Sequence, residues 1–293
     1  MGTALVGIGT LSGSIPFIPN ISVPSAHAAV NNEVGKDRVE GETLASFTKA
    51  RQLESDGMFA DAQRFYEEVI EAEPEFIYAW SNLGNVLISE GNLEQGLLCY
   101  KKALSLGPPK DQLAIIIMNK ASVEMSLGST EQALRDLGYA ERLSGPTQII
   151  TTNKAVALTQ AGKWKEGCDL FESVFSSAEK NALPWWLRFS MSLLETDRGT
   201  EAVAYLQRTL NRFPYESEAK AYASALYTAL GTPKEAGRYW RDMKPAERQE
   251  YLQKGFVEDK LKWGPKATTA FQKFLNTKYA VITVVTEPVA VVE

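Results

Sequence analysis

Apolar and polar residues follow a regular pattern in the stretch AWSNLGNVLISEGNLEQGLLCYKKALSLGPP, which runs from Ala79 to Pro109. Apolar residues recur at helical spacing on both sides of Gly91, and glycine suits the left-handed residue that ends a helix. The stretch therefore predicts two helices joined by a tight turn. Since a helical pair of this length is too short to be a domain, we asked whether it is repeated.

The pattern occurs six times along the chain. Alignment on the turn glycine gives intervals of 34, 37, 34, 35 and 34 residues between copies. The copies start near Thr43, Ile77, Ala114, Gln148, Leu183 and Ser217, which predicts repeats over 43–76, 77–113, 114–147, 148–182, 183–216 and 217–245. A fixed period of about 34 residues predicts stacked helical hairpins rather than a single closed core.

Two positions in each copy hold only Gly, Ala or Ser, as expected where two helix axes cross closely. The eighth position holds Ala50, Gly84, Ala121, Ala155, Ser190 and Ser224, and the twentieth holds Ala62, Gly96, Ala133, Gly167, Ala202 and Ala236. The turn position holds Gly57, Gly91, Gly128, Gly162, Asp197 and Gly231. The twenty-fourth position is large and apolar, and holds Tyr66, Tyr100, Leu137, Phe171, Leu206 and Trp240.

The second copy carries nearly the whole pattern of one repeat family, in Trp80, Leu83, Gly84, Gly91, Gly96, Tyr100 and Pro108. The chain therefore resembles the tetratricopeptide repeat (TPR) family over about residues 43–245. The resemblance implies an all-α fold, a right-handed superhelical α-solenoid of about six repeats with capping helices at the C-terminal end. It also implies that the first helices of the repeats line a concave groove that binds proteins.

The regions outside the repeats have distinct compositions. Residues 1–28 carry no charged side chain and end in Ala26-His27-Ala28, a signal for peptidase cleavage, so they predict a targeting segment. No positive residue precedes the apolar run, which leaves open whether the numbering starts inside a longer precursor. The segment resembles the second half of the two-part signals of chloroplast thylakoid-lumen proteins. A secretory or periplasmic destination, or a tail without a targeting role, are the alternatives.

Residues 29–42 are predicted to be a linker, and residues 246–275 to be capping helices. In the cap, Tyr251, Leu252 and Phe256 are expected to cover the last repeat. The Val-rich segment 276–293 is predicted to be an extended tail. Whether it docks on the solenoid, on a partner or on a membrane stays open.

Composition argues against most enzyme classes. The 293 residues contain one histidine, which lies in the predicted targeting segment, and two cysteines without zinc spacing. No phosphate loop, nucleophile–base pair or metal cluster is present, so neither an enzyme nor a cofactor or metal site is expected. The net charge of −5 argues against a general nucleic-acid binder.

The charge is uneven, and this bears on partner binding. Residues 29–110 contain eight Lys and Arg against fourteen Asp and Glu, whereas residues 219–279 contain twelve against six. These windows therefore carry net charges of −6 and +6. An acidic front and a basic back orient an approaching partner, although solvated helix faces give the same pattern.

Candidate binding residues come from the first helices. Asn82, Asn119 and Asn153 occupy the sixth position of three consecutive copies, where the family resemblance implies an asparagine that faces the groove. An asparagine amide can pair with the backbone of an extended peptide of any sequence. Trp185 is expected to be an exposed aromatic anchor. The other members of the predicted face are Asn85, Arg188, Tyr78, Met118, Met125 and Met191.

These observations predict a non-catalytic scaffold that binds a protein or an extended peptide in its groove. The resemblance to lumenal proteins of chloroplasts implies a role in the assembly or stability of a photosynthetic membrane complex. An exported bacterial or secretory adaptor is the alternative, and an enzyme-regulatory scaffold is a weaker one. The identity of the partner and the oligomeric state are not predicted.

Overall fold

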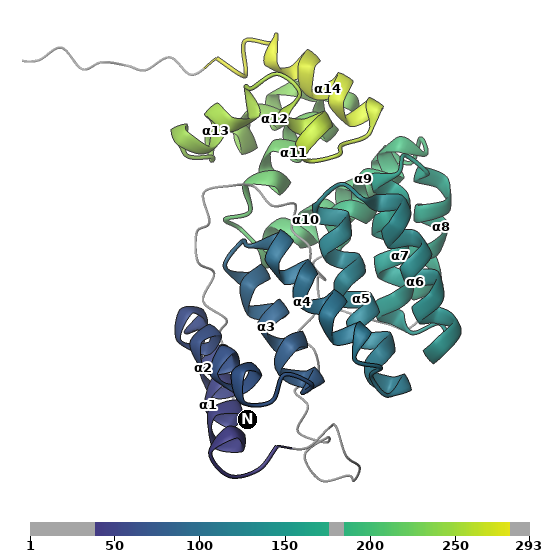
Figure 1. The fold of residues 1–293 in the computed structure, drawn as a ribbon. Coiled ribbons are helices and arrows are strands. Elements are labelled where there is room, and N and C mark those ends of the chain that lie inside the picture. The colour runs from purple at the N-terminus through teal and green to yellow at the C-terminus, as the bar shows by residue number, and fades with distance from the viewer. Residues whose placement is uncertain (1–38, 176–184, 282–293) are drawn as a thin grey trace, which may run out of the picture. The chain divides into compact units, whose positions relative to one another are not determined.

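The computed structural model describes residues 39–175 and 185–281, and every element in this part of the chain is a helix. The chain divides after Ala161 into two compact units, each of which is described by itself. The first unit contains α1 (Gly41–Ser55), α2 (Phe59–Ala72), α3 (Ile77–Ser89), α4 (Leu93–Ser105), α5 (Lys110–Ser126), α6 (Thr130–Ser144) and α7 (Gln148–Gln160) (Figure 1). The all-α repeat fold predicted from the sequence is confirmed.

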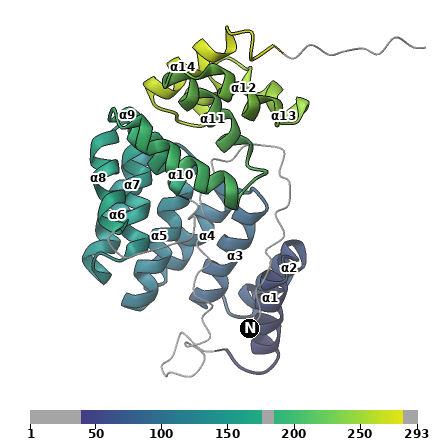
Figure 2. The ribbon, with the colours of Figure 1, turned by 180° about the vertical axis from the view of Figure 1, so that it is seen from behind.

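The second unit begins with α8 (Trp164–Phe175), so the predicted fourth repeat contributes one helix to each unit. It continues with α9 (Trp186–Glu195), α10 (Gly199–Arg212), α11 (Ser217–Ala229), α12 (Pro233–Arg241), α13 (Pro245–Tyr251), the short π-helix η1 (Phe256–Lys260) and α14 (Pro265–Leu275). Figure 2 shows the same helices from behind.

The helices of the first unit form two layers. Each helix packs against the next along the chain, from α1 to α7. The first helices of the hairpins also touch one another, because α1 contacts α3, α3 contacts α5, and α5 contacts α7. This second set of contacts places the candidate asparagines of α3, α5 and α7 on adjacent helices.

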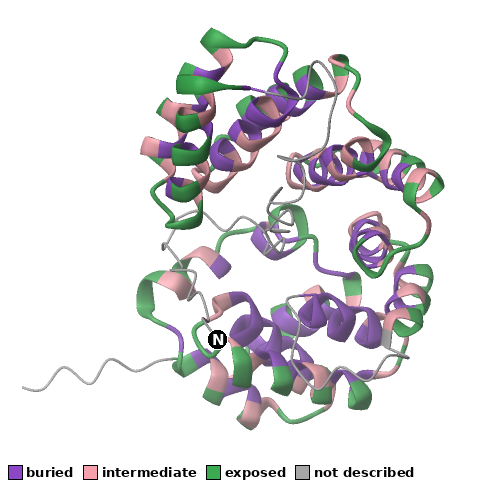
Figure 3. Ribbon diagram, turned by 90° about the horizontal axis from the view of Figure 1, so that it is seen from below, coloured by how far each residue is buried: buried purple, intermediate pink, exposed green. Residues whose placement is uncertain are grey.

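All twelve small residues at the predicted crossing positions are buried. The α3–α4 pair shows why they must be small: a Cβ on Gly96 would lie 2.6 Å from Ile88 Cγ1 and 3.0 Å from the carbonyl oxygen of Gly84. A Cβ on Gly84 would lie 2.9 Å from the ring of Tyr100. In Figure 3 the buried residues lie where helices of a unit face each other, and the exposed ones lie on turns and outer surfaces.

The turns between paired helices share one backbone conformation. Gly91 has φ 87°, and the N–H of Asn92 donates to the carbonyl of Leu87 at 2.8 Å, which closes the end of α3. Asp197 has φ 65° at the equivalent position, although a side chain at positive φ costs about 1 kcal/mol or more. The first helix of the hairpin therefore ends with the same backbone geometry whether the turn residue is glycine or, in the fifth repeat, aspartate.

Helix α14 caps the second unit by packing against α11 and α9. Phe271 and Phe274 on α14 meet the ring of Trp240 at 5.7 and 5.9 Å. Tyr251 and Phe256 are buried as predicted, but Leu252 is 50% exposed, so the prediction that it covers the last repeat is wrong. The aromatic side chains of α14 cover Trp240 instead.

Five of the predicted segments fall wholly or partly outside the described residues. These are the targeting segment 1–28, most of the linker 29–42, residues 176–182 of the fourth repeat, residues 183–184 of the fifth and residues 282–293 of the tail. Residues 276–281 of the tail are described, and the carbonyl of Ala280 accepts a hydrogen bond from Trp240 Nε1 at 3.2 Å.

Candidate functional site

A chain of polar side chains crosses the first-helix layer of the first unit. The hydroxyl of Tyr100 donates to Asn85 Oδ1 at 2.6 Å. Asn119 Nδ2, from the neighbouring helix α5, donates to the same oxygen at 3.3 Å. One repeat earlier, Tyr66 donates to Glu54 Oε2 at 2.6 Å. We call Glu54, Tyr66, Asn85, Tyr100 and Asn119 the polar ladder.

Burial keeps the two tyrosines of the ladder protonated. Burial raises the pKa of the Tyr66 and Tyr100 hydroxyls, so both remain protonated and can donate. Burial also raises the pKa of Glu54, although its hydrogen bonds to Tyr66 and Asn85 oppose this shift. The side chains of the ladder are therefore oriented by one another before any partner binds.

The ladder ends before α7. Asn153 corresponds to Asn119 one repeat later, but Leu137 stands where Tyr66 and Tyr100 stand in the earlier repeats. Ser122 stands where Asn85 does, and its hydroxyl donates to the backbone carbonyl of Met118 at 3.1 Å. Asn153 is only 4% exposed, and its Nδ2 has no hydrogen-bond partner among the described residues. A buried amide without a partner costs about 1–3 kcal/mol, which a bound acceptor would recover.

Helix α7 also contains a buried hydrogen-bond acceptor. Gln160 Oε1 is buried and has no partner among the described residues. Gln160 lies seven residues after Asn153, which is two helical turns and places both on the same side of α7. Together they provide a donor and an acceptor, which are the two groups that a peptide backbone needs.

Asn82 lies at the edge of the ladder. Its side chain is half-buried, and its Oδ1 accepts a weak hydrogen bond from Ser81 Oγ at 3.5 Å. Asn82 and the half-buried Asn85 are thus the two predicted asparagines with partly accessible amides. Asn119, at 8% exposure, is held by Asn85.

The other residues predicted to line the face are largely buried. Tyr78, Met118 and Met125 are 9%, 8% and 4% exposed in the first unit, and Tyr78 packs against Phe76 with ring centroids 5.5 Å apart. Met191 in the second unit is fully buried, so the prediction that it lines the binding face is wrong. Met191 lies in α9, all of whose residues from Trp186 to Leu194 are buried.

Trp185 corrects the sequence analysis most clearly. It was expected to be an exposed anchor, but it is 6% exposed and stacks on Phe171 with ring planes 8° apart. Trp186 meets it edge to face at 6.4 Å. Phe171 on α8 covers the Trp185 ring, and Trp186 packs edge-on against Trp185 and Tyr205, so neither indole is exposed to a partner.

Arg188 belongs to a buried network in the second unit. Its guanidinium donates to Glu218 Oε1 at 3.2 Å, and Trp263 Nε1 donates to the same oxygen at 3.0 Å. Breaking a buried pair by removing one partner costs about 3–5 kcal/mol. Arg188 therefore stabilises the packing of α9, α11 and the segment before α14.

A cluster of charged side chains in the first unit was not predicted from the sequence. Lys120 lies between Glu124 and Asp136 and pairs with both carboxylates. Burial raises the pKa of Glu124, and its Oε2 has no partner among the described residues. Only the helical spacing of Lys120 and Glu124 was visible in the sequence, because the approach of Asp136 depends on how α5 and α6 cross.

The described residues contain no group of three or more His, Cys, Asp or Glu side chains that could hold a metal ion. None of the helices in the same part of the chain combines the length and the apolar composition that a membrane span needs.

Cys99 and Cys168 are both buried free thiols, and burial raises the pKa of Cys99 to about 11. A thiol with such a pKa is a poor nucleophile.

Comparison with known proteins supports the repeat assignment. Residues 77–109 match the tetratricopeptide repeat family. Protein FlbA of Caulobacter vibrioides is 29% identical over 150 residues, which cover 50% of this chain and 24% of FlbA. The chain thus matches about a quarter of the length of that relative.

Three solved structures share the fold at low sequence identity. The APC/C hetero-tetramer Cut9–Hcn1 gives a TM-score of 0.63 at 13% identity, over 80% of this chain and 42% of the other. The type IV pilus biogenesis factor PilW gives 0.59 at 13%, over 79% and 99%. A tetratricopeptide repeat protein from Parabacteroides merdae gives 0.51 at 15%, over 78% and 100%. Residues 77–109 are therefore a tetratricopeptide repeat, and the chain has the fold of the tetratricopeptide-repeat proteins.

Proposed function

We propose that the protein is a non-catalytic scaffold that binds an extended segment of a partner protein across α3, α5 and α7. The observation that carries the proposal is the buried amide of Asn153, whose Nδ2 has no partner among the described residues. The asparagines of the three helices offer amides to a peptide backbone, which is the same in every sequence. The contacts between successive first helices support a continuous path for the partner.

The polar ladder supports the proposal by fixing side chains in advance. Asn85 and Asn119 are hydrogen-bonded to each other and Asn85 to Tyr100, so binding does not have to order them. A surface that is already ordered loses less conformational entropy when it binds. The ladder fixes the side chains of Asn85 and Asn119 at one end of the proposed binding path. At the other end, Asn153 supplies a hydrogen-bond donor without a partner among the described residues.

The cellular setting belongs to the same proposal. The composition of residues 1–28 supports a thylakoid-lumen protein that assists assembly or stability of a photosynthetic membrane complex. The 29% identity with FlbA, a bacterial protein, favours the alternative of an exported bacterial adaptor. Because the segment resembles the second half of a two-part signal, import of the labelled full chain into isolated thylakoids separates the two: cleavage and lumenal protection support the first, and export with cleavage by bacterial membranes but not by thylakoids supports the second.

The proposed site is tested with peptides selected against the full chain from a random library. Asn153→Ala should weaken binding of a selected peptide about five- to tenfold, the equivalent of one hydrogen bond, and should not lower the free energy of unfolding. Asn119→Ala should lower both the affinity for the peptide and the free energy of unfolding, because it breaks the hydrogen bond to Asn85. Asn211→Ala, an exposed residue of α10, is the matched control. Unchanged binding by Asn153→Ala would contradict the proposed site.

A further inference from the structure

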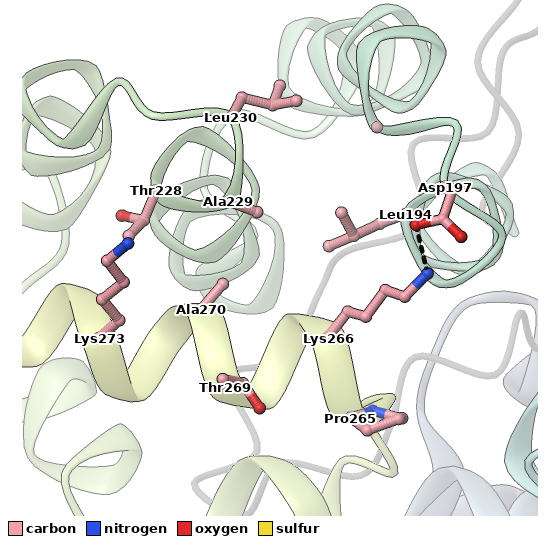
Figure 4. Close-up of a pocket in the computed structure, with 11 residues that line it drawn as sticks. Leu194, Asp197, Thr228, Ala229, Leu230, Pro265, Lys266, Thr269, Ala270 and Lys273 are labelled. Atoms are coloured by element: carbon pink, nitrogen blue, oxygen red, sulfur yellow. Dashed lines mark hydrogen bonds and ion pairs between the residues drawn. The ribbon is translucent and has the colours of Figure 1, made fainter.

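The second unit contains a cavity of about 560 Å³ between the ends of α9 and α11 and one side of α14 (Figure 4). Leu194, Leu230 and Ala270 form its apolar walls. Thr269 and Lys273 lie on the side of α14 that lines it, and both are exposed. A cavity of this volume can hold several side chains, so it is large enough for a short peptide segment.

The cavity has one committed and one uncommitted lysine. Lys266 Nζ pairs with Asp197 Oδ1 at 2.6 Å and donates to the backbone carbonyl of Glu195 at 2.8 Å. Lys273, two turns further along α14, has no carboxylate partner among the described residues, and Figure 4 shows its side chain reaching toward Thr228. The cavity therefore combines apolar walls with an unneutralised positive charge.

The C-terminal part of the second unit is also basic. Residues 219–279 carry a net charge of +6, from twelve Lys and Arg against six Asp and Glu. Lys234, Arg238 and Arg241 on α12 likewise have no carboxylate partner in the described part of the chain. The cavity thus fits an occupant that is apolar and acidic.

Residues 282–293 of the same chain, ITVVTEPVAVVE, have this chemistry. They contain five valines, an isoleucine and two glutamates, and no lysine or arginine. These residues lie outside the described part of the chain. Just before them, the chain is anchored to α12 through the bond from Trp240 Nε1 to the carbonyl of Ala280, and Tyr279 packs against Gly237.

The tether is long enough to reach the cavity. Twelve residues span up to about 40 Å when extended, whereas α14, along which the cavity lies, has 11 residues and is about 16 Å long. Trp240, which anchors the chain near residue 280, also contacts the C-terminal half of α14 through Phe274. A tethered segment has an effective concentration in the millimolar range, so even a weak contact is populated.

We propose that the cavity between α9, α11 and α14 binds the segment 282–293 of the same chain, with valine side chains against Leu194 and Leu230 and a glutamate against Lys273. The tail then acts as a built-in occupant of this site. An external protein segment with the same apolar and acidic chemistry would have to displace it.

A zero-length cross-linking experiment on the full chain tests the proposal. A carbodiimide joins a lysine amine to a carboxylate in contact with it, and the water released is taken up by the reagent. We expect Lys273 to be joined to Glu287 or Glu293 in preference to the exposed Lys234 and Lys254. Mixing ¹⁴N and ¹⁵N chains before the reaction should give only products within one isotope, as contact within one chain requires.

Two substitutions on α14 provide the matched comparison. Thr269→Trp places an indole in the mouth of the cavity and should lower the Lys273 product at least fivefold. Gln272→Trp is also at an exposed position of α14 but does not line the cavity, and should leave the yield within twofold. Circular dichroism should show equal unfolding midpoints for the two variants.

Three results would overturn the proposal. Products spread evenly over Lys234, Lys254 and Lys273 would show that the tail has no preferred site. Products that mix the two isotopes would assign the tail to a second copy of the chain. Equal yields in Thr269→Trp and Gln272→Trp would show that the cavity does not hold the tail.

Discussion

At the scale of single residues, equivalent positions in successive repeats have different roles. Asn119 and Asn153 occupy the same place in their repeats, yet one is hydrogen-bonded to Asn85 and the other has a buried Nδ2 without a partner among the described residues. The difference follows from Ser122, which stands where Asn85 stands one repeat earlier and has no amide oxygen to accept from Asn153. One substitution in a first helix thus leaves the amide on the next first helix without its acceptor.

Glu54 gives the ladder a predicted dependence on pH. Burial raises the pKa of its carboxyl, so the folded protein holds this proton more tightly than the unfolded chain does. The contribution of Glu54 to the free energy of unfolding therefore falls as pH rises through the raised pKa. Glu54→Gln removes the charge and keeps an acceptor for Tyr66, so it should raise the urea midpoint at pH 7.5.

The same substitution should have a smaller effect at acidic pH, because a larger fraction of the wild-type carboxyl is then protonated in the folded state. Urea unfolding followed by circular dichroism at the two pH values measures the difference. Glu71→Gln, at an exposed position of α2, is the control. A Glu54→Gln variant that is less stable than wild type at pH 7.5 would show that the charged form is favoured instead.

At the scale of the elements, the helical hairpin depends on how closely its two helices cross. In α3 and α4 the crossing leaves so little room that a Cβ on Gly96 would meet Ile88 and the backbone of Gly84. Gly138 in α6 is different, because a Cβ there would find only the end of Arg142, at 3.8 Å. The two glycines sit in second helices of neighbouring repeats and make a matched pair.

Gly96→Ala should lower the free energy of unfolding by about 1–3 kcal/mol, because the added carbon forces the helices apart. Gly138→Ala should raise it by up to about 1 kcal/mol, because alanine favours the helix and nothing obstructs its methyl group. Chemical unfolding of both variants measures the difference. If Gly96→Ala were as stable as Gly138→Ala, the close crossing would not exist.

The hairpins were predictable from sequence because their determinants are local and repeat. Small residues at the crossings and glycine at the turns recur at fixed spacing, so their burial and backbone conformations followed from the pattern. The pattern did not predict that Trp185 would be buried, because the partner surface, Phe171, comes from the preceding repeat. The pairing of Arg188 with Glu218 was missed for the same reason, since 30 residues separate them.

The proposed binding face shows the same contrast between local and long-range determinants. The asparagines of α3, α5 and α7 could be placed on one layer from their spacing. Their hydrogen bonds could not, because the partner of Asn119 lies 34 residues away on α3. The cavity beside α14 could not be predicted from the sequence either, because the residues that line it come from three helices whose packing only the structure shows.

At the scale of the whole molecule, the two units carry different candidate sites. The first unit presents the polar ladder and Asn153, and the window 29–110 gives it an acidic character, with a net charge of −6. The second unit contains the cavity beside Lys273 in a basic surrounding. A partner peptide for the first unit and an apolar, acidic segment for the second therefore differ in chemistry and can be studied separately.

We propose that the first helices of the first unit hold an extended peptide through asparagine amides. The side-chain amide spectrum of the ¹⁵N-labelled chain, recorded during titration with a library-selected peptide, tests this for each asparagine. We expect the largest shift for the Asn153 side-chain amide, smaller shifts for Asn82 and Asn85, and none for Asn211. An unchanged Asn153 signal at saturation, with shifts elsewhere, would contradict it.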